Sequence, residues 1–533
     1  MVGGIYTVLS TRAKTLQQVW KDKVVFIGPD FGQGKETPLF IEDTKLFPKW
    51  VEKAATEGLH VRTGRWNILG KPLVVLVDFT PYFRSKNEIY GTMWADFQVD
   101  SLRAYGDYDE ASMFSYGAGR VVESFYNYYL RKDKQRVVFH AHEWMTGAGA
   151  LYVRKHVPAI ATIFTTHATS IGRSIAGNHK PLYDYLYAYN GNQMALELNM
   201  EAKHSIERVT AHNVDCFTTV SDVTGRECKE LLDRPCDAIL MNGFESDFVP
   251  TGAAFTAARK RARKQLLAVA NALTGCCFSD DTLIVATSGR YEYKNKGIDV
   301  FLEAMNRLQG HDALKRPVLA FIEVPAWSAG PREDLVQRLV EGGEYDTPLD
   351  TPVITHHLHN AEEDKVLNTL RWFNMQNQAE SRVKVIFVPC YLDGKDGVFN
   401  TPYYDLLIGN DLSVYPSYYE PWGYTPLESV AFKVPSITTS LSGFGLWANR
   451  EKGGQSKIAD GVEVIERTDS NYTEVAEAIV RTIVEYAACN KKETDAARKA
   501  AAALAKKALW KHFIQYYYEA YDIALRNAEN RNL

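Results

Sequence analysis

Apolar and polar positions follow two alternating patterns along the chain. Short apolar, β-branched runs recur, and longer segments with a helical period separate them. Runs without a polar face are typical of strands buried on both sides, so the pattern predicts parallel strands joined by crossover helices. In the first half the predicted strands are residues 23–27, 73–77, 136–139, 159–165, 215–220 and 238–241.

A second series of strands follows a turn-rich segment at residues 242–252, whose glycines and proline indicate a boundary. The predicted fold class is therefore α/β, with two Rossmann-like domains that face each other, residues 1–250 and 251–508. The rhythm breaks at about residues 326–380, where we expect a helical insertion on the second domain. The strands predicted in the second domain are residues 282–287, 317–322, 383–388, 412–415, 436–439 and 462–465.

The tail from Asn490 to Leu525 is rich in alanine and other strong helix formers and then in aromatic residues. Aromatic side chains at helical spacing need a surface to cover. We predict that the last helix, within residues 509–533, crosses back onto the first domain.

Composition narrows the class of protein. The chain has 533 residues with 61 basic and 65 acidic side chains and a net charge of -4, which excludes binding of nucleic acid or anionic membrane by overall charge. No apolar run approaches the roughly 18 residues of a membrane span, and no signal peptide is recognisable, so we expect a cytosolic protein. Seven cysteines without a C-x-x-C pair predict neither disulfides nor structural zinc. The basic run 259–264 is interpreted as a solvated helix face.

The most informative segment, residues 417–428, directly follows a predicted strand, at the edge of the sheet where ligands bind in open α/β folds. Thr425 is the predicted N-cap of the next helix, with Glu428 completing a capping box. The first helical turn would then direct backbone N–H groups at a phosphate. Gly423 allows close approach of the backbone, and we assign Glu420 to the site. For Glu428 a structural capping role and a functional role are equally supported.

A second basic signal lies in the loop after the strand at 282–287. Arg290 and Lys296 are six residues apart and can converge on one diphosphate. In the first domain, His167 and Arg173 follow the strand at 159–165.

One strand earlier stand His142 and Glu143, which a hydrogen-bonded pair at the sheet edge would also explain. No third ligand lies at a useful spacing, so we predict no metal site. The pair Gly147 and Gly149 lacks the third glycine of a dinucleotide fingerprint, because Tyr152 takes that place, and a nicotinamide site is rejected.

Together these motifs resemble those of glycogen synthases of the animal and fungal type, which are retaining glycosyltransferases of GT-B architecture. The resemblance covers nearly the whole chain. Its motifs are residues 2–8, 139–144, 165–169, 289–297 and 418–426.

The resemblance implies transfer of glucose from UDP-glucose to the non-reducing end of an α-1,4-glucan such as glycogen, with retention and without a metal or other cofactor. Glu420 and Glu428 match the family's paired glutamates, and Arg290 and Lys296 match its diphosphate-binding pair. Tyr403 matches a tyrosine that stacks on uracil. The other candidate substrate-binding residues are Gly3, Gly4, His142, Glu143, His167, Arg173, Asn242, Trp422, Gly423, Tyr424 and Thr425.

The chain also departs from the family. The arginine-rich helix that senses glucose 6-phosphate is reduced to Arg498, and regulatory tails are absent, which favours an unregulated, bacterial-like member. The family has a strand before the glycine pair, so we expect the first domain to lack its first strand. The family's tetramers predict a homo-oligomer, either tetramer or dimer.

Three functions remain open at the level of sequence. The first is the glucan-elongating UDP-glucose transferase. The second is a related retaining transferase that uses ADP-glucose or makes a small glycoside. The third is a catalytically weak glucan-binding subunit. None of them involves nucleic acid or a membrane as partner.

Overall fold

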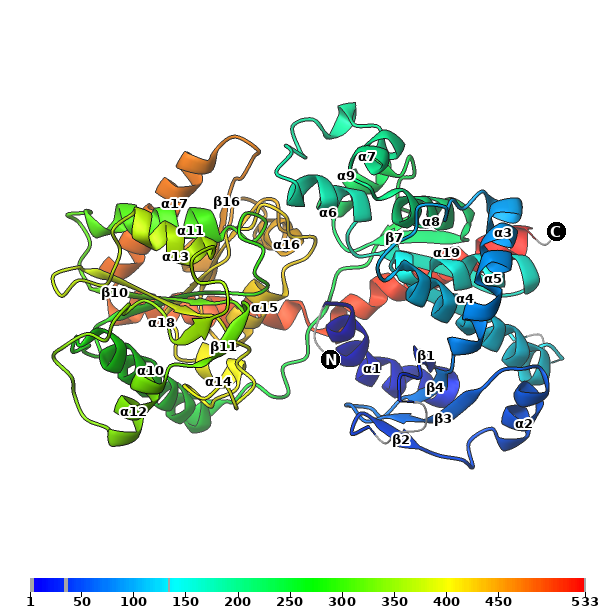
Figure 1. Cartoon of the computed structure of the whole chain (residues 1–533), viewed down its shortest axis with the longest axis horizontal. Coiled ribbons are helices and arrows are strands. Elements are labelled where there is room, and N and C mark those ends of the chain that lie inside the picture. Colours follow the sequence, from blue (N-terminus) through cyan, green and yellow to red (C-terminus); the bar gives the residue numbers. More distant parts are fainter. Residues whose placement is uncertain (1–3, 33–36, 133–134, 532–533) are drawn as a thin grey trace. The chain divides into compact units, whose positions relative to one another are not determined.

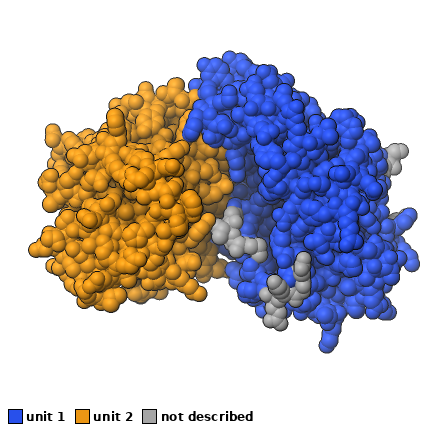
Figure 2. Space-filling model, in the orientation of Figure 1, with its two compact units in different colours: residues 1–245, 508–533 blue, residues 246–507 orange. Residues whose placement is uncertain are grey.

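The computed structural model describes residues 4–32, 37–132 and 135–531. It divides into two compact units, which Figure 2 colours separately. Unit 1 comprises Met1–Glu245 and Ala508–Leu533, and unit 2 comprises Ser246–Lys507. The predicted limits at residues 250 and 508 lie close to these positions.

Unit 1 contains two four-stranded sheets. The first is mixed, in the order β1-β4-β3-β2, with β1 parallel to β4 and the other pairs antiparallel. The sequence pattern predicted β1 and β4 but missed β2 and β3, because β3 carries Arg62, Thr63 and Arg65 and lacks an apolar run. The strands are β1 Val25–Pro29, β2 Phe40–Glu42, β3 Val61–Trp66 and β4 Leu73–Val77.

The second sheet of unit 1 is parallel and follows chain order, β5-β6-β7-β8. β6 and β7 are buried along their whole length, whereas β1 and the first half of β5, the terminal strands of their sheets, are only half-buried. The strands are β5 Val138–His142, β6 Ala161–Thr166, β7 Cys216–Thr219 and β8 Ala238–Ile239.

The helices of unit 1 include the predicted return of the chain. The last helix, α19 (Trp510–Arg531), packs on β6, β7 and α1 (Gly4–Trp20), and it is the red helix of Figure 1. The other helices are α2 Pro48–Thr56, α3 Lys86–Phe97, α4 Tyr108–Phe125, α5 Gly147–His156, α6 Ser170–Gly177, α7 Gly191–Glu197, α8 Glu201–Asn213 and α9 Asp222–Leu231.

Both ends of α19 are fastened to unit 1. At its start the fully buried Trp510 donates from Nε1 to Thr11 Oγ1 at 2.8 Å. At its end Arg531 makes a bidentate ion pair with Asp215, with both N···O distances 2.9 Å. A Cβ on Gly243 would lie 2.5 Å from the ring of Trp510, so the indole fills its site closely.

Unit 2 is built on one six-stranded parallel sheet in the order β13-β10-β9-β14-β15-β16. Chain order runs outward from β9 to β10 and β13, then returns to β14 on the other side of β9. The topological switch point therefore lies between β9 and β14. The strands are β9 Leu283–Ser288, β10 Val318–Glu323, β13 Val383–Val388, β14 Leu412–Val414, β15 Ser436–Thr439 and β16 Val462–Ile465.

Helices cover both faces of this sheet, as the sequence pattern predicted (Figure 1). Alternate residues of β9, β10 and β13 pack against α11, α13 and α17 on one face and against α10 and α12 on the other. The helices of unit 2 are α10 Gly252–Thr274, α11 Ile298–Gln309, α12 Glu333–Glu341, α13 Lys365–Trp372, α14 Tyr403–Leu407, α15 Tyr424–Ala431, α16 Gly443–Lys452, α17 Tyr472–Ala488 and α18 Lys491–Lys507.

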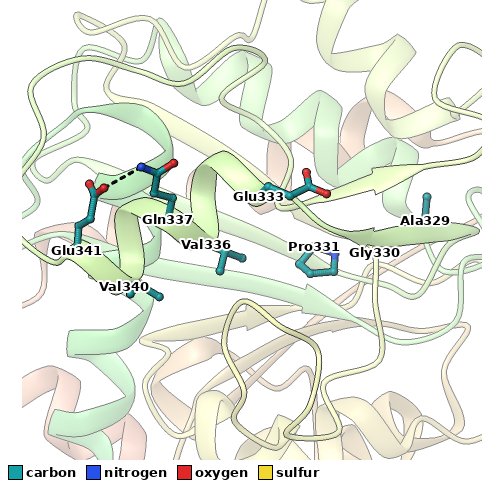
Figure 3. A pocket seen from close by; sticks show the side chains of 8 residues that line it. All are labelled: Ala329, Gly330, Pro331, Glu333, Val336, Gln337, Val340 and Glu341. Atoms are coloured by element: carbon teal, nitrogen blue, oxygen red, sulfur yellow. Dashed lines mark hydrogen bonds between the residues drawn. The ribbon is translucent and has the colours of Figure 1, made fainter.

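The segment predicted as a helical insertion, residues 326–380, is only partly helical. Besides α12 and α13 it contains an antiparallel ribbon of β11 (Ser328–Pro331) and β12 (His356–Leu358). A surface hollow of about 550 Å³ lies over β11 and α12 (Figure 3). No predicted site residue lines this hollow.

The basic run on α10 is a solvated face only in part: three of its five basic side chains are exposed, as predicted, but two arginines are not. Arg259 and Arg263 lie on the buried side of the helix and share Asp411, at 2.5 and 2.7 Å. They fasten α10 to the turn before β14. Within the described ranges, no helix combines the length and the apolar character needed to cross a bilayer.

The anchoring of α19 yields a stability prediction. Replacing Trp510 with Ala leaves a large cavity and removes the bond to Thr11, so unit 1 should lose about 3–5 kcal/mol of unfolding free energy. Trp372→Ala is the matched control, because that side chain is 85% exposed. Denaturant unfolding of both variants measures the effect, and an equal response of the two would contradict the anchoring role.

Candidate functional site

The switch point of unit 2 brings together two loops, one after β9 and one after β14. The carbonyl of Asn295 accepts from the backbone N–H groups of Tyr418 and Tyr419 at 2.9 and 3.0 Å. Gly297 has φ of 70°, and a Cβ there would lie 2.1 Å from the carbonyl oxygen of Pro416, so only glycine allows this contact. The two loops therefore form one packed element at the carboxyl ends of the strands.

An ion pair joins two of the predicted site residues across these loops. Lys296 Nζ lies 2.5 Å from Glu420 Oε2, and both side chains are about five-sixths buried. Ser417 donates a weaker bond to the same oxygen at 3.4 Å. Arg290, on the same loop as Lys296, is 60% exposed and contacts Glu292 at 3.0 Å. A basic group and a carboxylate are thus held at the switch point, with a second cation exposed beside them.

The helix after Glu420 begins differently from the prediction. α15 begins at Tyr424 with Gly423 as N-cap, at φ of 112°, and the structure has no side-chain cap there, so the predicted Thr425 cap and capping box are wrong. A Cβ on Gly423 would lie 2.8 Å from Ser442 Oγ, which itself donates to the Trp422 carbonyl. Pro426 has no N–H, so the polar first turn of α15 consists of the amides from Gly423 to Thr425.

Glu428 is therefore not a capping residue. It is buried within α15 and accepts a hydrogen bond from the Tyr404 hydroxyl at 2.8 Å. Burial raises its pKa to about 7, and the Tyr404 bond opposes that rise. The capping explanation for this glutamate no longer applies.

Two aromatic residues predicted to belong to the site, Trp422 and Tyr403, also lie in unit 2. Trp422 is buried and packs against Phe444 and Trp447, so its ring supports the loop. Tyr403 is half-buried on α14, and its hydroxyl bonds to Ser288 Oγ at 2.7 Å, at the end of β9.

The histidines of unit 1 form a second group, at the ends of β5 and β6. His142 Nδ1 lies 3.0 Å from His167 Nε2, and His140 stacks on His142 with ring centroids 4.1 Å apart. Burial, together with the charge of the buried Arg12, lowers the pKa of all three, that of His167 to about 3. These imidazoles are therefore neutral hydrogen-bonding groups at pH 7.

Three buried carboxylates hold the loop that carries His167. Glu143 Oε1 accepts from the backbone N–H groups of His167 and Ala168 at 2.8 and 3.2 Å. Glu207 accepts from the Thr166 hydroxyl and from both the N–H and the hydroxyl of Ser170, the latter two at 2.8 and 2.7 Å. In addition, Glu227 Oε2 accepts from Thr169 Oγ1 at 2.6 Å. We call Glu143, Glu207 and Glu227 the carboxylate cradle.

Glu143 occupies a strained conformation. Its φ of 68° and ψ of 162° lie in a region that L-residues rarely adopt. Burial and the neighbouring Glu207 raise its pKa to about 7, against the opposing charge of Arg173. The strain and the raised pKa concentrate at the loop that the sequence assigned to the site.

The other predicted positions of unit 1 are more dispersed. Arg173 lies on α6 with an exposed side chain, near enough to Glu143 and Glu207 to affect their charge. Asn242 is buried in the segment after β8. Gly4 begins α1 and is exposed, and Gly3 lies outside the described residues.

A cluster of possible metal ligands lies elsewhere, at His356, Cys390 and Asp396. His356 already bonds through Nε2 to the Asp396 carbonyl and through Nδ1 to Thr355. The Asp396 carboxylate accepts three backbone N–H groups of its own loop, and burial raises the pKa of the Cys390 thiol to about 12. The histidine and the carboxylate are thus already used in hydrogen bonds within the loop, and the thiol stays protonated. These three groups do not suit a metal ion.

Sequence reasoning missed the supporting groups of both sites. Glu207 and Glu227 belong to helices α8 and α9, and each contacts a loop far away in the chain. Tyr404 and Ser288 were likewise not singled out. Glu207 and Glu227 stand among other polar residues in the sequences of α8 and α9, so the sequence pattern did not distinguish them from surface positions.

Comparison with known sequences gives a consistent result. The family model described as glycogen synthase matches residues 1–333 and 346–532. The glycogen [starch] synthase of Neurospora crassa is 28% identical, covering 99% of this chain and 82% of its own length, and the liver glycogen [starch] synthase of Homo sapiens gives the same values. Isoform 2 of Saccharomyces cerevisiae is also 28% identical, over 98% of this chain and 84% of its own.

Solved structures support the fold. The catalytic domain of starch synthase IV from Arabidopsis thaliana, bound to ADP and acarbose, superposes with a TM-score of 0.56 at 15% identity and covers 99% of this chain and 97% of its own. A sucrose-phosphate synthase from Thermosynechococcus elongatus gives 0.52 at 15% identity, with coverages of 98% and 93%. Both are similar in architecture, which is that of GT-B glycosyltransferases, as the sequence motifs predicted.

The carboxylate cradle predicts local stabilisation of the His167 loop. Glu207→Gln replaces one carboxylate oxygen, a hydrogen-bond acceptor, with an NH₂ group, which is a donor. This NH₂ group would face the donating groups of Thr166 or Ser170, and no hydrogen bond could form there. Because a buried unmatched group costs about 1–3 kcal/mol, amide exchange of residues 166–170 should accelerate about tenfold or more. Glu197→Gln, at an exposed position on α7, should leave these rates unchanged. Unaltered exchange in Glu207→Gln would contradict the cradle.

The raised pKa of Glu143 predicts a pH dependence of stability. The folded state holds this proton more tightly than the unfolded chain, so its stabilising contribution is complete below about pH 4.5 and is lost as pH rises through about 7. Glu143→Gln keeps an acceptor for the two amides and should remove this loss. The difference in unfolding free energy between variant and wild type, measured from pH 5 to 8, should therefore grow with pH; a constant difference would contradict the assignment. The buried histidines contribute a pH dependence of the opposite sign, but they are present in both proteins, so their contribution cancels when the two unfolding free energies are subtracted.

Proposed function

The chain belongs to the glycogen synthase family, and on this basis we propose that it transfers glucose from UDP-glucose to the non-reducing end of an α-1,4-glucan with retention of configuration. The observation that supports this most directly is the Lys296–Glu420 ion pair at the switch point of unit 2. It joins a diphosphate-binding cation to the carboxylate that would face the sugar.

In this proposal the diphosphate of the donor binds at the switch point. Arg290 is exposed and can turn from Glu292 to the phosphates, and Lys296 lies within the same loop. The first turn of α15 adds backbone N–H groups and the positive end of the helix dipole. These groups stabilise the charge that develops on the leaving UDP, so the reaction as proposed requires no metal.

The bond changes take place on one face of the sugar. The bond between C1 of glucose and the β-phosphate oxygen breaks, and the 4-hydroxyl of the acceptor attacks C1 from the same side. Its proton passes to the departing phosphate oxygen. Glu420 stabilises the positive charge that develops on the sugar, or orients the sugar, and it does not need to form a covalent bond.

The remaining site residues take positioning roles. Glu428 is a buried carboxyl close to half-protonation at pH 7, so it can donate or accept a hydrogen bond to a hydroxyl of the donor. In unit 1 the neutral His142 and His167, with Arg173 beside them, offer hydrogen bonds suited to sugar hydroxyls. A homo-oligomeric state stays a prediction.

The role of Glu420 is tested by Glu420→Gln, which keeps the size and the bond to Ser417 but removes the negative charge. Loss of one well-placed electrostatic contact costs roughly 3–4 kcal/mol in the transition state, so kcat for glucose incorporation from UDP-glucose should fall about 10²- to 10³-fold. Glu474→Gln, at an exposed position on α17, is the control. Activity of Glu420→Gln within a few fold of wild type would refute the role.

The proposed reaction itself is tested by UDP release from UDP-glucose, measured with and without glycogen. Release that depends on glycogen is expected. Protein that binds glycogen but releases no UDP would identify a glucan-binding subunit instead, and faster turnover of ADP-glucose would identify the other transferase.

A further inference from the structure

Glu323 is a buried acid at the end of β10, one strand away from the switch point. In the register of the parallel sheet it lies between Ser288 of β9 and Val388 of β13, the last residues of their strands. Side chains in register on neighbouring strands share a face, so Glu323 lies on the same face as Ser288. Its position is thus at the ligand-binding edge of the sheet, about 4.8 Å along from β9.

Among the described residues, one buried oxygen of the Glu323 carboxyl has no hydrogen-bond partner. The residue is 6% exposed, and Oε2 makes no hydrogen bond within the part of the chain that the structure describes. Burial raises its pKa to about 8, so the group is mainly a neutral acid at pH 7. A neutral acid presents one O–H donor beside one carbonyl acceptor. Because an unsatisfied buried polar group is costly, its retention at a ligand-binding edge calls for a ligand.

The surroundings of Glu323 connect it to the donor-binding loop. Its charge contributes to the raised pKa of both the Tyr403 phenol and the Cys390 thiol, so it lies close to both. Tyr403 in turn bonds to Ser288, two residues before Arg290. A nucleotide whose diphosphate lies on Arg290 and Lys296 can therefore extend its base past Ser288 and Tyr403 toward Glu323.

We propose that Glu323 is a specificity residue for the base of the nucleotide donor, and that it binds an edge on which an N–H lies beside a hydrogen-bond acceptor. Uracil presents this arrangement at N3–H and the adjacent carbonyl. The acid accepts from the N–H and donates to the carbonyl, so two bonds form in one plane. This inference rests on the proposed function, because it takes the diphosphate position from it. Adenine has a similar edge, and the experiment separates the two bases.

The test compares Glu323→Gln, Glu323→Leu and the control Glu333→Gln, which is at an exposed position on α12. The probes are UDP and ADP, whose binding is measured by calorimetry on the full chain. A glutamine keeps an acceptor beside a donor and should preserve UDP affinity within a few fold. A leucine removes both the acceptor and the donor, so the affinity for UDP should fall roughly 10- to 100-fold. This is the range for a good bidentate contact to a base.

A pH series distinguishes recognition from a purely structural role. Above about pH 8 the acid ionises and loses its donor, so UDP affinity of the wild type should fall there, whereas that of Glu323→Gln should not. The titratable groups that face Glu323 are Tyr403 and Cys390. Burial raises the pKa of the Tyr403 phenol well above its ordinary value and that of the Cys390 thiol to about 12, so neither group titrates in this range. No charged side chain in the described ranges bonds to Glu323.

The outcomes are distinct. Unchanged UDP binding in Glu323→Leu would overturn the inference, and so would a loss confined to ADP, since it would assign the residue to adenine. UDP affinity restored by glutamine but not by leucine supports it. Failure of the wild type to transfer glucose would refute the proposed function alone, because the binding comparison does not depend on turnover.

Discussion

The carboxyl ends of all strands of a parallel sheet lie at the same edge, and in unit 2 this constraint places the residues that we propose bind the donor. Because β9 is laid down first and β14 returns on its other side, the loops after these strands leave the sheet as neighbours and pack against each other. Lys296 and Glu420 meet where these loops touch, and the turn into α15 adds its N–H groups. The site depends on backbone topology first and on side chains second. A change in strand order would disperse the same residues.

Buried carboxyl groups are the second common element. Glu143, Glu207, Glu428 and Glu323 are all removed from water, and burial raises the pKa of each. The first three are stabilised by hydrogen bonds from loops or from a tyrosine, whereas the buried oxygen of the fourth receives no hydrogen bond from the residues that the structure describes. A buried carboxyl group without hydrogen bonds destabilises the fold, whereas a buried carboxyl group that accepts hydrogen bonds from a loop makes that loop rigid. This contrast separates groups that hold the site together from a group available to a ligand.

The sequence predicted the buried strands well, because a strand covered on both faces must be apolar throughout. Predicted and observed limits coincide for β13, β15 and β16. The half-exposed strands β3 and β11 were missed, since their side chains do not form an apolar run. Thr425 had the chemistry and spacing of a cap, but Gly423, with its positive φ, is the N-cap, so α15 begins two residues earlier than predicted. The motifs singled out Lys296, Glu420 and Glu143, whereas the other two cradle residues, Glu207 and Glu227, were missed. Glu207, for example, reaches Thr166 only through the tertiary fold.

The two sheets of unit 1 have a consequence for how this protein behaves in concentrated solution. β1 and β5 each pair on one side only within the described residues, and both are half-buried. Such strands present a row of backbone donors and acceptors that any extended chain can complete. Edges of this kind are templates for association between molecules. Self-association through unit 1 would be governed by backbone geometry, and surface charge near neutrality would do little to oppose it.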